Sequence, residues 1–159
     1  MFFCRRHLRV PLFEPDYMPT RTELKELATT RLEEAKALFA SGLYDGCCYL
    51  AGYVVELALK ARICKVLDLI DYPDTGEISR SFKTHKLDDL IRLAGLQRKF
   101  DAAKAVNPRL LTNWSLVTAW TEEFRYKPVG SSPRIRAEEI IFALEDRMDG
   151  VFTWIKKRW

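Results

Sequence analysis

The sequence predicts an all-α fold, an antiparallel up-down four-helix bundle with one or two short extra helices. Apolar residues recur at helical spacing in long stretches joined by short connections. No segment alternates apolar and polar residues at the period of two that a half-buried strand shows. We expect one domain over residues 20–159, preceded by an extended arm over residues 1–19, which hold three prolines and no sustained period.

The first half of the domain predicts a helical hairpin. Its first helix should begin at Thr20 or Thr22, either of which can cap it, and end at Gly42. Glycine at that end permits a tight reversal, so the second helix, from about Leu43 to Leu67, should run back antiparallel beside the first.

The middle of the chain predicts a loop followed by short helices. Residues 68–83 carry a proline, a glycine and several polar residues without a period, which favours a loop and a candidate edge of a binding cleft. Thr84 is a candidate N-cap for a short helix that Gly95 ends. A further short helix is expected around residues 97–105.

Two longer helices are predicted in the last third. Asn107 followed by Pro108 is the pattern of an N-cap with proline at the first helical position, and this helix should end near Tyr126. Residues 127–134 are a loop by composition. The final helix is expected to start near Ile135 and to continue on apolar residues as far as Ile155.

Charge and hydropathy set broad limits on function. Lysine and arginine number 26 against 22 acidic residues, a mild basic excess that is compatible with nucleotide or nucleic-acid partners but not typical of a protein that coats DNA. No apolar run is long enough to span a membrane and no secretory signal is evident, so we expect a cytoplasmic protein with no membrane partner. The basic end, Lys156 to Arg158, is expected to be a solvated helix terminus, with phosphate contact as the alternative.

The cysteines predict no metal site. Cys47, Cys48 and Cys64 fall within one predicted helix and are interpreted as small buried hydrophobic residues. Cys4 with His7 supplies only two of the ligands a metal would need. Glycine-rich phosphate loops and the usual hydrolase motifs are absent from the sequence, so no cofactor is expected either.

The second helix carries the strongest candidate site. Tyr53, Glu56 and Lys60 share one face of it, and Glu56 precedes Lys60 by four residues, the favourable order for an ion pair. Charged groups in so apolar a segment usually survive only when paired, and Arg125 is a candidate third partner. A buried structural network and a functional cleft both remain open interpretations.

Other candidates are weaker. His85 lies at a predicted helix start, where it is either a structural group or a direct participant in binding or catalysis. Trp114, Trp120 and Phe124 hold helical spacing with aliphatic neighbours, so we interpret them as core residues, not as platforms for base stacking.

Three segments together resemble a known family. They are LYDGCCYLAGYVVELALKA, the pair TH followed by KLDDLI, and the tryptophan-containing helix that ends in Arg125-Tyr126. They resemble the HEPN family (higher eukaryotes and prokaryotes nucleotide-binding) over roughly Thr20 to Trp154. The resemblance implies a bundle of four to five helices, a homodimer, and a minimal nucleotidyltransferase as a possible partner. Many members are metal-independent RNases in toxin-antitoxin or phage-defence systems.

The resemblance also suggests site residues. It implies Arg125 and His85 as catalytic candidates, with Tyr53, Glu56, Lys60 and Tyr126 as nucleotide- or RNA-binding or supporting residues. RNase members carry a histidine four to six residues after their arginine, whereas Arg125 is followed by Tyr-Lys-Pro-Val-Gly-Ser-Ser. His85 could replace that histidine as the general acid or base only if the fold brings it to the same phosphate.

Three functions are therefore weighed. The first is a nucleotide- or RNA-binding component of a toxin-antitoxin-like or phage-defence module that is paired with a minimal nucleotidyltransferase. Here Arg125 would bind phosphate, His85 would hydrogen-bond phosphate or sugar, and Glu56 would orient the arginine. The alternatives are a metal-independent endoribonuclease with a degenerate motif and a dimeric scaffold without catalysis.

Overall fold

The computed structural model describes residues 17–73 and 81–159. Within these residues there are seven α-helices and no β-strand, which confirms the all-α class. The elements are α1 (Arg21–Ala40), α2 (Tyr44–Leu67), α3 (Leu87–Leu93), α4 (Gln97–Val106), α5 (Pro108–Thr118), the 3-10 helix η2 (Glu122–Tyr126), α6 (Arg134–Glu145) and α7 (Val151–Lys156). The Cys4–His7 pair lies outside the described residues, as do residues 1–16 of the predicted arm and residues 74–80 of the predicted loop over 68–83.

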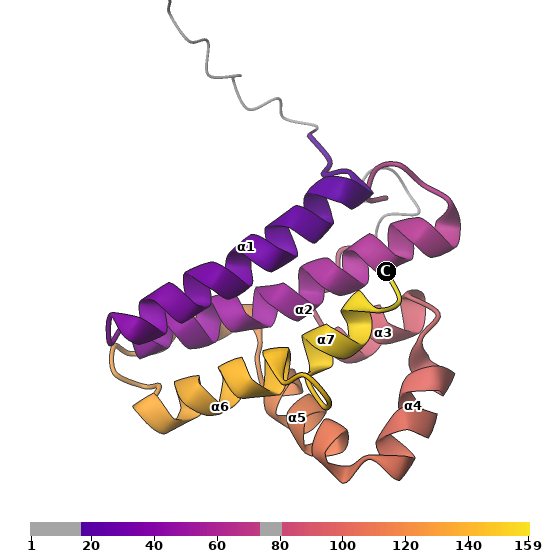
Figure 1. The fold of residues 1–159 in the computed structure, drawn as a ribbon. Helices are drawn as coiled ribbons and strands as arrows, with labels where there is room; N and C mark the ends of the chain where they lie inside the picture. Colours follow the sequence, from indigo (N-terminus) through magenta and orange to yellow (C-terminus); the bar gives the residue numbers. More distant parts are fainter. Residues whose placement is uncertain (1–16, 74–80) are drawn as a thin grey trace, which may run out of the picture.

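The predicted hairpin is confirmed, since α1 and α2 lie antiparallel and side by side (Figure 1). Thr20 caps α1 through a capping box, in which its hydroxyl accepts from the Glu23 backbone N–H at 3.2 Å and the Glu23 carboxylate accepts from the Thr20 N–H at 2.8 Å. The reversal follows at Gly42, whose φ of +75° is a conformation that glycine adopts without strain.

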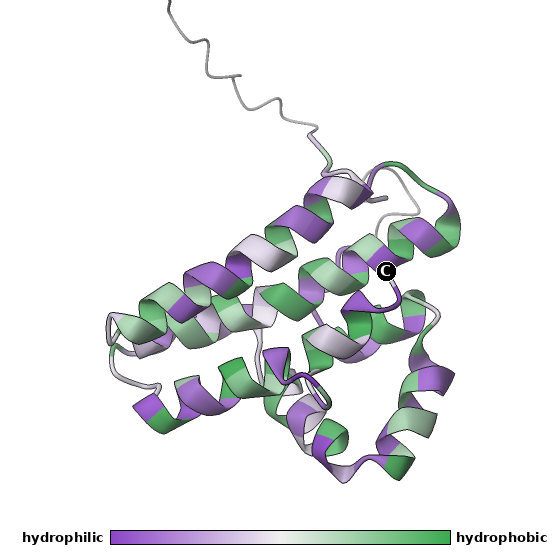
Figure 2. Cartoon of the chain, viewed as in Figure 1, coloured by the Kyte–Doolittle hydropathy of each residue, from purple (hydrophilic) through white to green (hydrophobic). Residues whose placement is uncertain are grey.

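Helix α2 is the centre of the molecule. It packs against α1, α3, α6, α7 and η2, and Figure 1 shows it between α1 and the helices of the second half. Its buried positions lie on all sides of the helix, as is typical of a helix inside a core, and Figure 2 shows many hydrophilic residues along α1 by contrast. Neighbours therefore cover most of the α2 surface, including part of the face that carries Tyr53, Glu56 and Lys60.

Two predicted helices are interrupted. The helix that begins at Asn107, whose side chain accepts from the Leu110 N–H at 3.0 Å, ends at Thr118 and not near Tyr126. The final helix is divided into α6 and α7. Asp146 breaks it by accepting the N–H of Asp149 at 2.7 Å, and a Cβ on Gly150 would lie 2.5 Å from the Asp146 carbonyl oxygen.

The start of α3 also differs from the prediction. Lys86 occupies the N-cap position, and the Thr84 hydroxyl accepts from the Lys86 N–H at 3.1 Å instead of capping the helix. This turn holds the segment before α3 and with it His85. The short helix predicted around residues 97–105 is confirmed as α4, and the up-down four-helix topology stays a prediction.

The core confirms two interpretations of individual residues. Trp114 packs edge to face on Phe100, with ring centroids 4.7 Å apart, and Phe100 packs at the same distance on Trp154. Cys47, Cys48 and Cys64 are all buried free thiols, and burial raises the pKa of the Cys47 thiol to about 12.

Candidate functional site

Glu56 is the buried centre of a small charged cluster on α2. Its side chain is only 3% exposed, and its Oε1 lies 3.0 Å from the Lys60 Nζ. His85 Nδ1 lies 3.0 Å from each of the two carboxylate oxygens. The predicted Glu56–Lys60 pair is therefore confirmed, as a buried pair that also holds a histidine.

The orientation of His85 follows from this contact. An ionised carboxylate can only accept, so Nδ1 carries the hydrogen that points to Glu56, and the other ring nitrogen is left for another partner. The His85 side chain is 40% exposed. A carboxylate that fixes an imidazole while the ring keeps access to solvent is an arrangement suited to hydrogen bonding or proton transfer.

The Lys60 side chain is largely buried and pairs with Glu56. Its side chain is 13% exposed, and Nζ lies 5.0 Å from the centre of the Tyr72 ring in addition to its contact with Glu56. The buried carboxylate is thus matched by one ammonium group and by the histidine, which is the condition under which buried charge is tolerated.

Two tyrosines continue the polar face of α2 away from Glu56. The hydroxyls of Tyr49 and Tyr53 lie 3.1 Å apart. Burial raises the pKa of Tyr53, and the hydrogen bond with Tyr49 and the nearby charge of Glu56 raise it further, so its hydroxyl stays protonated and can donate. The Tyr53 hydroxyl is therefore a neutral hydrogen-bonding group beside the charged cluster.

Trp120 anchors the segment after α5 to this face. Its indole Nε1 donates to the Tyr49 carbonyl at 3.0 Å, and its ring packs edge to face on Tyr53 with centroids 5.0 Å apart. The ring fills the space beside Gly52, where a Cβ would lie 2.0 Å from Trp120 Cδ2. Glycine at this position is what allows the indole to approach α2. Trp120 is buried, as predicted, but in a turn and not in a continuous helix with Trp114.

Arg125 lies on η2 at the exposed end of this arrangement. The nearby hydroxyls of Tyr126 and Tyr49, in that order, raise the pKa of Arg125. The guanidinium also lies 4.8 Å from the centre of the Tyr126 ring, and Tyr126 is 75% exposed. Among the residues that the structure describes, no carboxylate forms an ion pair with Arg125.

Asp45 fixes the loop that follows η2. Its carboxylate accepts the backbone N–H of Gly130 at 2.5 Å and that of Ser132 at 2.7 Å. These bonds, led by the one from Gly130, lower the pKa of Asp45. Asp45, in the first turn of α2, therefore holds the loop after η2, and Trp120 holds the segment before η2.

The fold brings most of the predicted site residues to one face of α2, but the predicted contact between Glu56 and Arg125 does not form. Glu56 does not contact Arg125, whose hydrogen-bonding partners are tyrosines. His85 joins the α2 face at Glu56 and Arg125 joins it at Tyr49, two helical turns away, or about 10 Å along the axis.

Sequence reasoning missed three residues that build this site. Gly52, Trp120 and Asp45 position the η2 segment, but none of them carries the chemistry that draws attention to a candidate site. The glycine directly before Tyr53, in the segment resembling the family, was the available signal, because a glycine inside an otherwise apolar helix often marks a close approach by another group.

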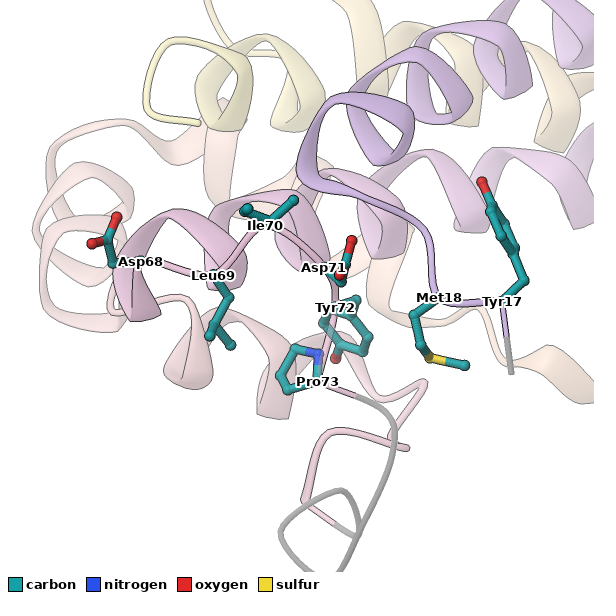
Figure 3. A pocket seen from close by; sticks show the side chains of 8 residues that line it. All are labelled: Tyr17, Met18, Asp68, Leu69, Ile70, Asp71, Tyr72 and Pro73. Carbon is teal, nitrogen blue, oxygen red and sulfur yellow. The ribbon is translucent and has the colours of Figure 1, made fainter. Parts of the chain in front are cut away.

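A separate hollow of about 1040 Å³ lies at the other end of α2. Figure 3 shows its side chains, which come from the segment after α2 and from the residues that lead into α1: Tyr17, Met18, Asp68, Leu69, Ile70, Asp71, Tyr72 and Pro73. It offers two carboxylates and no basic side chain, so a phosphate group would be repelled there. We therefore place the candidate site at the α2–η2 face and not in this hollow.

Neither a metal-binding cluster nor a helix that could cross a membrane is found over residues 17–73 and 81–159. They contain no group of three or more histidine, cysteine, aspartate or glutamate side chains placed to hold a metal ion. None of the helices there combines the length and the apolar character needed to cross a lipid bilayer.

Comparison with known proteins gives one match. The family model of the HEPN domain matches residues 22–157, nearly the whole chain. Neither a curated protein nor a solved structure gives a significant match.

Proposed function

Because the chain belongs to the HEPN domain family, we propose that it is a nucleotide- or RNA-binding protein whose Arg125 receives a phosphate group. Membership of this family supports a nucleotide- or RNA-related function. We further propose that it acts in a toxin-antitoxin-like or phage-defence module beside a minimal nucleotidyltransferase.

The observation that carries the proposal is the difference in charge pairing along one face of α2. Glu56 is matched by Lys60 and His85, whereas the exposed guanidinium of Arg125 has only hydroxyl and aromatic neighbours. A guanidinium held by tyrosine hydroxyls keeps its full charge and its planar array of donors, which matches the oxygens of a phosphate. Arg125 is thus oriented without being neutralised.

The remaining residues support a ligand at this place. Tyr126 is exposed beside Arg125 and offers a ring face for a base, and Tyr53 and Tyr49 offer hydroxyls. In this proposal His85 hydrogen-bonds a phosphate or sugar from its exposed side. Glu56 orients His85, and no longer Arg125 as the sequence suggested.

The test is titration of nucleotides and a single-stranded RNA oligonucleotide with the wild-type chain and with Arg125→Ala. We expect the substitution to weaken binding at least about tenfold, the scale of one lost charge-assisted bidentate contact. Arg98→Ala, on the exposed surface of α4, is the matched control and should bind as wild type does. Equal binding by all three proteins would overturn the proposal.

A second function, a metal-independent endoribonuclease, is favoured by one observation, the carboxylate–imidazole contact between Glu56 and His85. His85 would move the proton in attack of a ribose 2′-hydroxyl, and Arg125 would stabilise the charge that develops on the phosphate. The test is incubation with mixed cellular RNA in the presence of a chelator. Cleavage that His85→Ala and Arg125→Ala both abolish would establish it, and intact RNA with wild type would leave the binding function or a scaffold.

A homodimer is also proposed, with its face beside the Asp45-bound loop. Leu43 is 56% exposed and Val129 fully exposed, and both line a hollow of about 360 Å³ between the α1–α2 turn and this loop. Exposed apolar side chains that gather in a hollow favour a protein contact. Light scattering should give a dimer for wild type and a monomer for Val129→Glu, and a monomeric wild type would refute the proposal.

A further inference from the structure

A second group of cations gathers at the C-terminal end of the chain, on a different side of α2 from Arg125. We call it the C-terminal basic cluster, and it consists of Arg21 and Lys25 of α1, Arg62 and Lys65 of α2, Lys156 of α7 and Arg158. Figure 1 shows the C-terminus beside the second half of α2. The structure thus adds cations from α1 and α2 to the basic end, which the sequence predicts to be solvated, with phosphate contact as the alternative.

Trp159 is the common contact of the cluster. The ammonium groups of Lys25 and Lys156 lie 5.5 Å and 6.0 Å from the centre of its ring, and Lys65 Nζ donates at 3.2 Å to a main-chain oxygen of Trp159, the last residue of the sequence. Arg62 Nη1 donates to the Arg158 carbonyl at 2.8 Å. These contacts hold the cations in place around one half-buried indole.

Within the described residues no aspartate or glutamate side chain forms an ion pair with this cluster. Arg62 donates to carbonyl oxygens, and Lys65 donates to a main-chain oxygen of the last residue, Trp159. Arg158 donates to the Trp154 carbonyl at 2.7 Å, and its guanidinium lies 3.5 Å from the centre of the Trp154 ring. Burial, followed by the charges of Arg21 and Lys65, lowers the pKa of Lys25. Six cations held together with few acidic groups among them favour an anion, because binding one relieves their repulsion.

The cluster stands apart from Arg125. Arg62 follows Tyr49, the α2 contact of Arg125, by thirteen residues, which is roughly 20 Å along the axis and more than half a turn around it. A single phosphate group cannot touch both places. The cluster is therefore a separate binding surface and not an extension of the first.

We infer that the C-terminal basic cluster is a second phosphate-binding surface, which holds the backbone of a single-stranded RNA with Trp159 available to a base. A hollow of about 360 Å³ beside Trp159, lined also by Lys25, Glu26, Thr29 and Thr30, leaves room at the ring. Cations interleaved with an aromatic side chain are the combination that binds single strands. The inference rests on the proposed function for its class of ligand but not on Arg125.

The test is the salt dependence of binding to a labelled, unstructured RNA oligonucleotide, followed by fluorescence anisotropy. The double variant Lys25→Gln/Lys65→Gln should weaken binding at least about fivefold and reduce the slope of log K against log salt by about 1.4, or about 0.7 for each lost phosphate contact. The charge-matched control is Arg98→Gln/Lys99→Gln on the exposed surface of α4, which should retain the wild-type slope.

A second variant, Lys65→Gln/Lys156→Gln, removes two exposed ammonium groups and keeps the test valid if the half-buried Lys25 proves necessary for folding. Equal losses in the cluster variants and the α4 control would overturn the inference, since they would show a response to net charge alone. Displacement of RNA by polyglutamate as readily as by unlabelled RNA would also overturn it and would indicate an acidic protein partner.

The two proposals fail separately. Loss of nucleotide binding in Arg125→Ala with a normal RNA slope in the cluster variants refutes only the second surface. A reduced slope in the cluster variants with unchanged nucleotide binding in Arg125→Ala refutes only the role of Arg125.

Discussion

Two charged places on the same face of α2 differ in how their charge is matched. Glu56 is buried, and Lys60 and His85 both lie 3.0 Å from it. Arg125 is exposed and is held by hydroxyl groups and a ring. The first arrangement pairs its charge within the protein, whereas the second has no carboxylate partner among the described residues and is the one we propose for a ligand. The comparison teaches that position on a common face does not give residues a common role.

The largest expected effect on stability comes from removing Glu56, the buried member of the paired cluster. Glu56→Ala should lower the free energy of unfolding by about 3 kcal/mol, the lower end of the range for broken buried pairs, because Lys60 and His85 can partly regain solvent. Urea denaturation measures it. Glu33→Ala, which removes an exposed partner of Lys36, should change stability by less than about 0.5 kcal/mol. A loss equally small at Glu56 would contradict the assignment of this pair to the fold.

A somewhat smaller effect on stability is expected at Gly52, which lies on α2 between Tyr49 and Glu56. Gly52→Ala puts a Cβ 2.0 Å from the Trp120 ring, so the indole and η2 must shift, at a cost of about 2 kcal/mol. Tryptophan fluorescence and urea denaturation measure the shift and the cost. Gly46→Ala, where the nearest atom is a flexible Leu38 methyl at 3.1 Å, is the control and should cost less. Identical results at both glycines would mean that Trp120 does not depend on Gly52.

The loop beside Arg125 should respond more weakly. Asp45→Asn weakens the hydrogen bonds to Gly130 and Ser132, and we expect a loss of no more than about 1 kcal/mol because the contacts are near the surface. The lowered pKa of Asp45 means that its contribution is present above the ordinary aspartate value of about 3.9 and disappears as pH falls through the lowered value. Amide hydrogen exchange of residues 130–132 should report both changes. A pH dependence at acid pH that persists in Asp45→Asn would point to another group.

The smallest effect on stability is expected at the unpaired place. Arg125→Ala should leave the urea midpoint unchanged within error, because the side chain is exposed and no acidic partner is left behind. Together with the binding titration, this outcome would separate the two places by function. A marked loss of stability would instead make Arg125 part of the fold and favour a scaffold.

The site shows where reading the sequence succeeds. Glu56 and Lys60 could be paired in advance because residues four apart on a helix are neighbours whatever the rest of the fold does. The caps at Thr20 and Asn107 were equally local. His85 could be suspected from its place at a predicted helix start and from the segment that resembles the family. Its partner could not be named, because the contact joins residues 29 positions apart.

The sequence by itself determined the helical class, the α1–α2 hairpin, the buried cysteines and the charged pair on α2. Each depends on spacing within a few residues, where backbone geometry decides which side chains meet. The tertiary structure decided that α2 is enclosed on most sides, that Trp120 rests on Gly52, that Asp45 holds a loop 85 to 87 residues away, and that cations from three parts of the chain surround Trp159. These arrangements arise from the packing of distant segments, and no local period encodes which segments will meet.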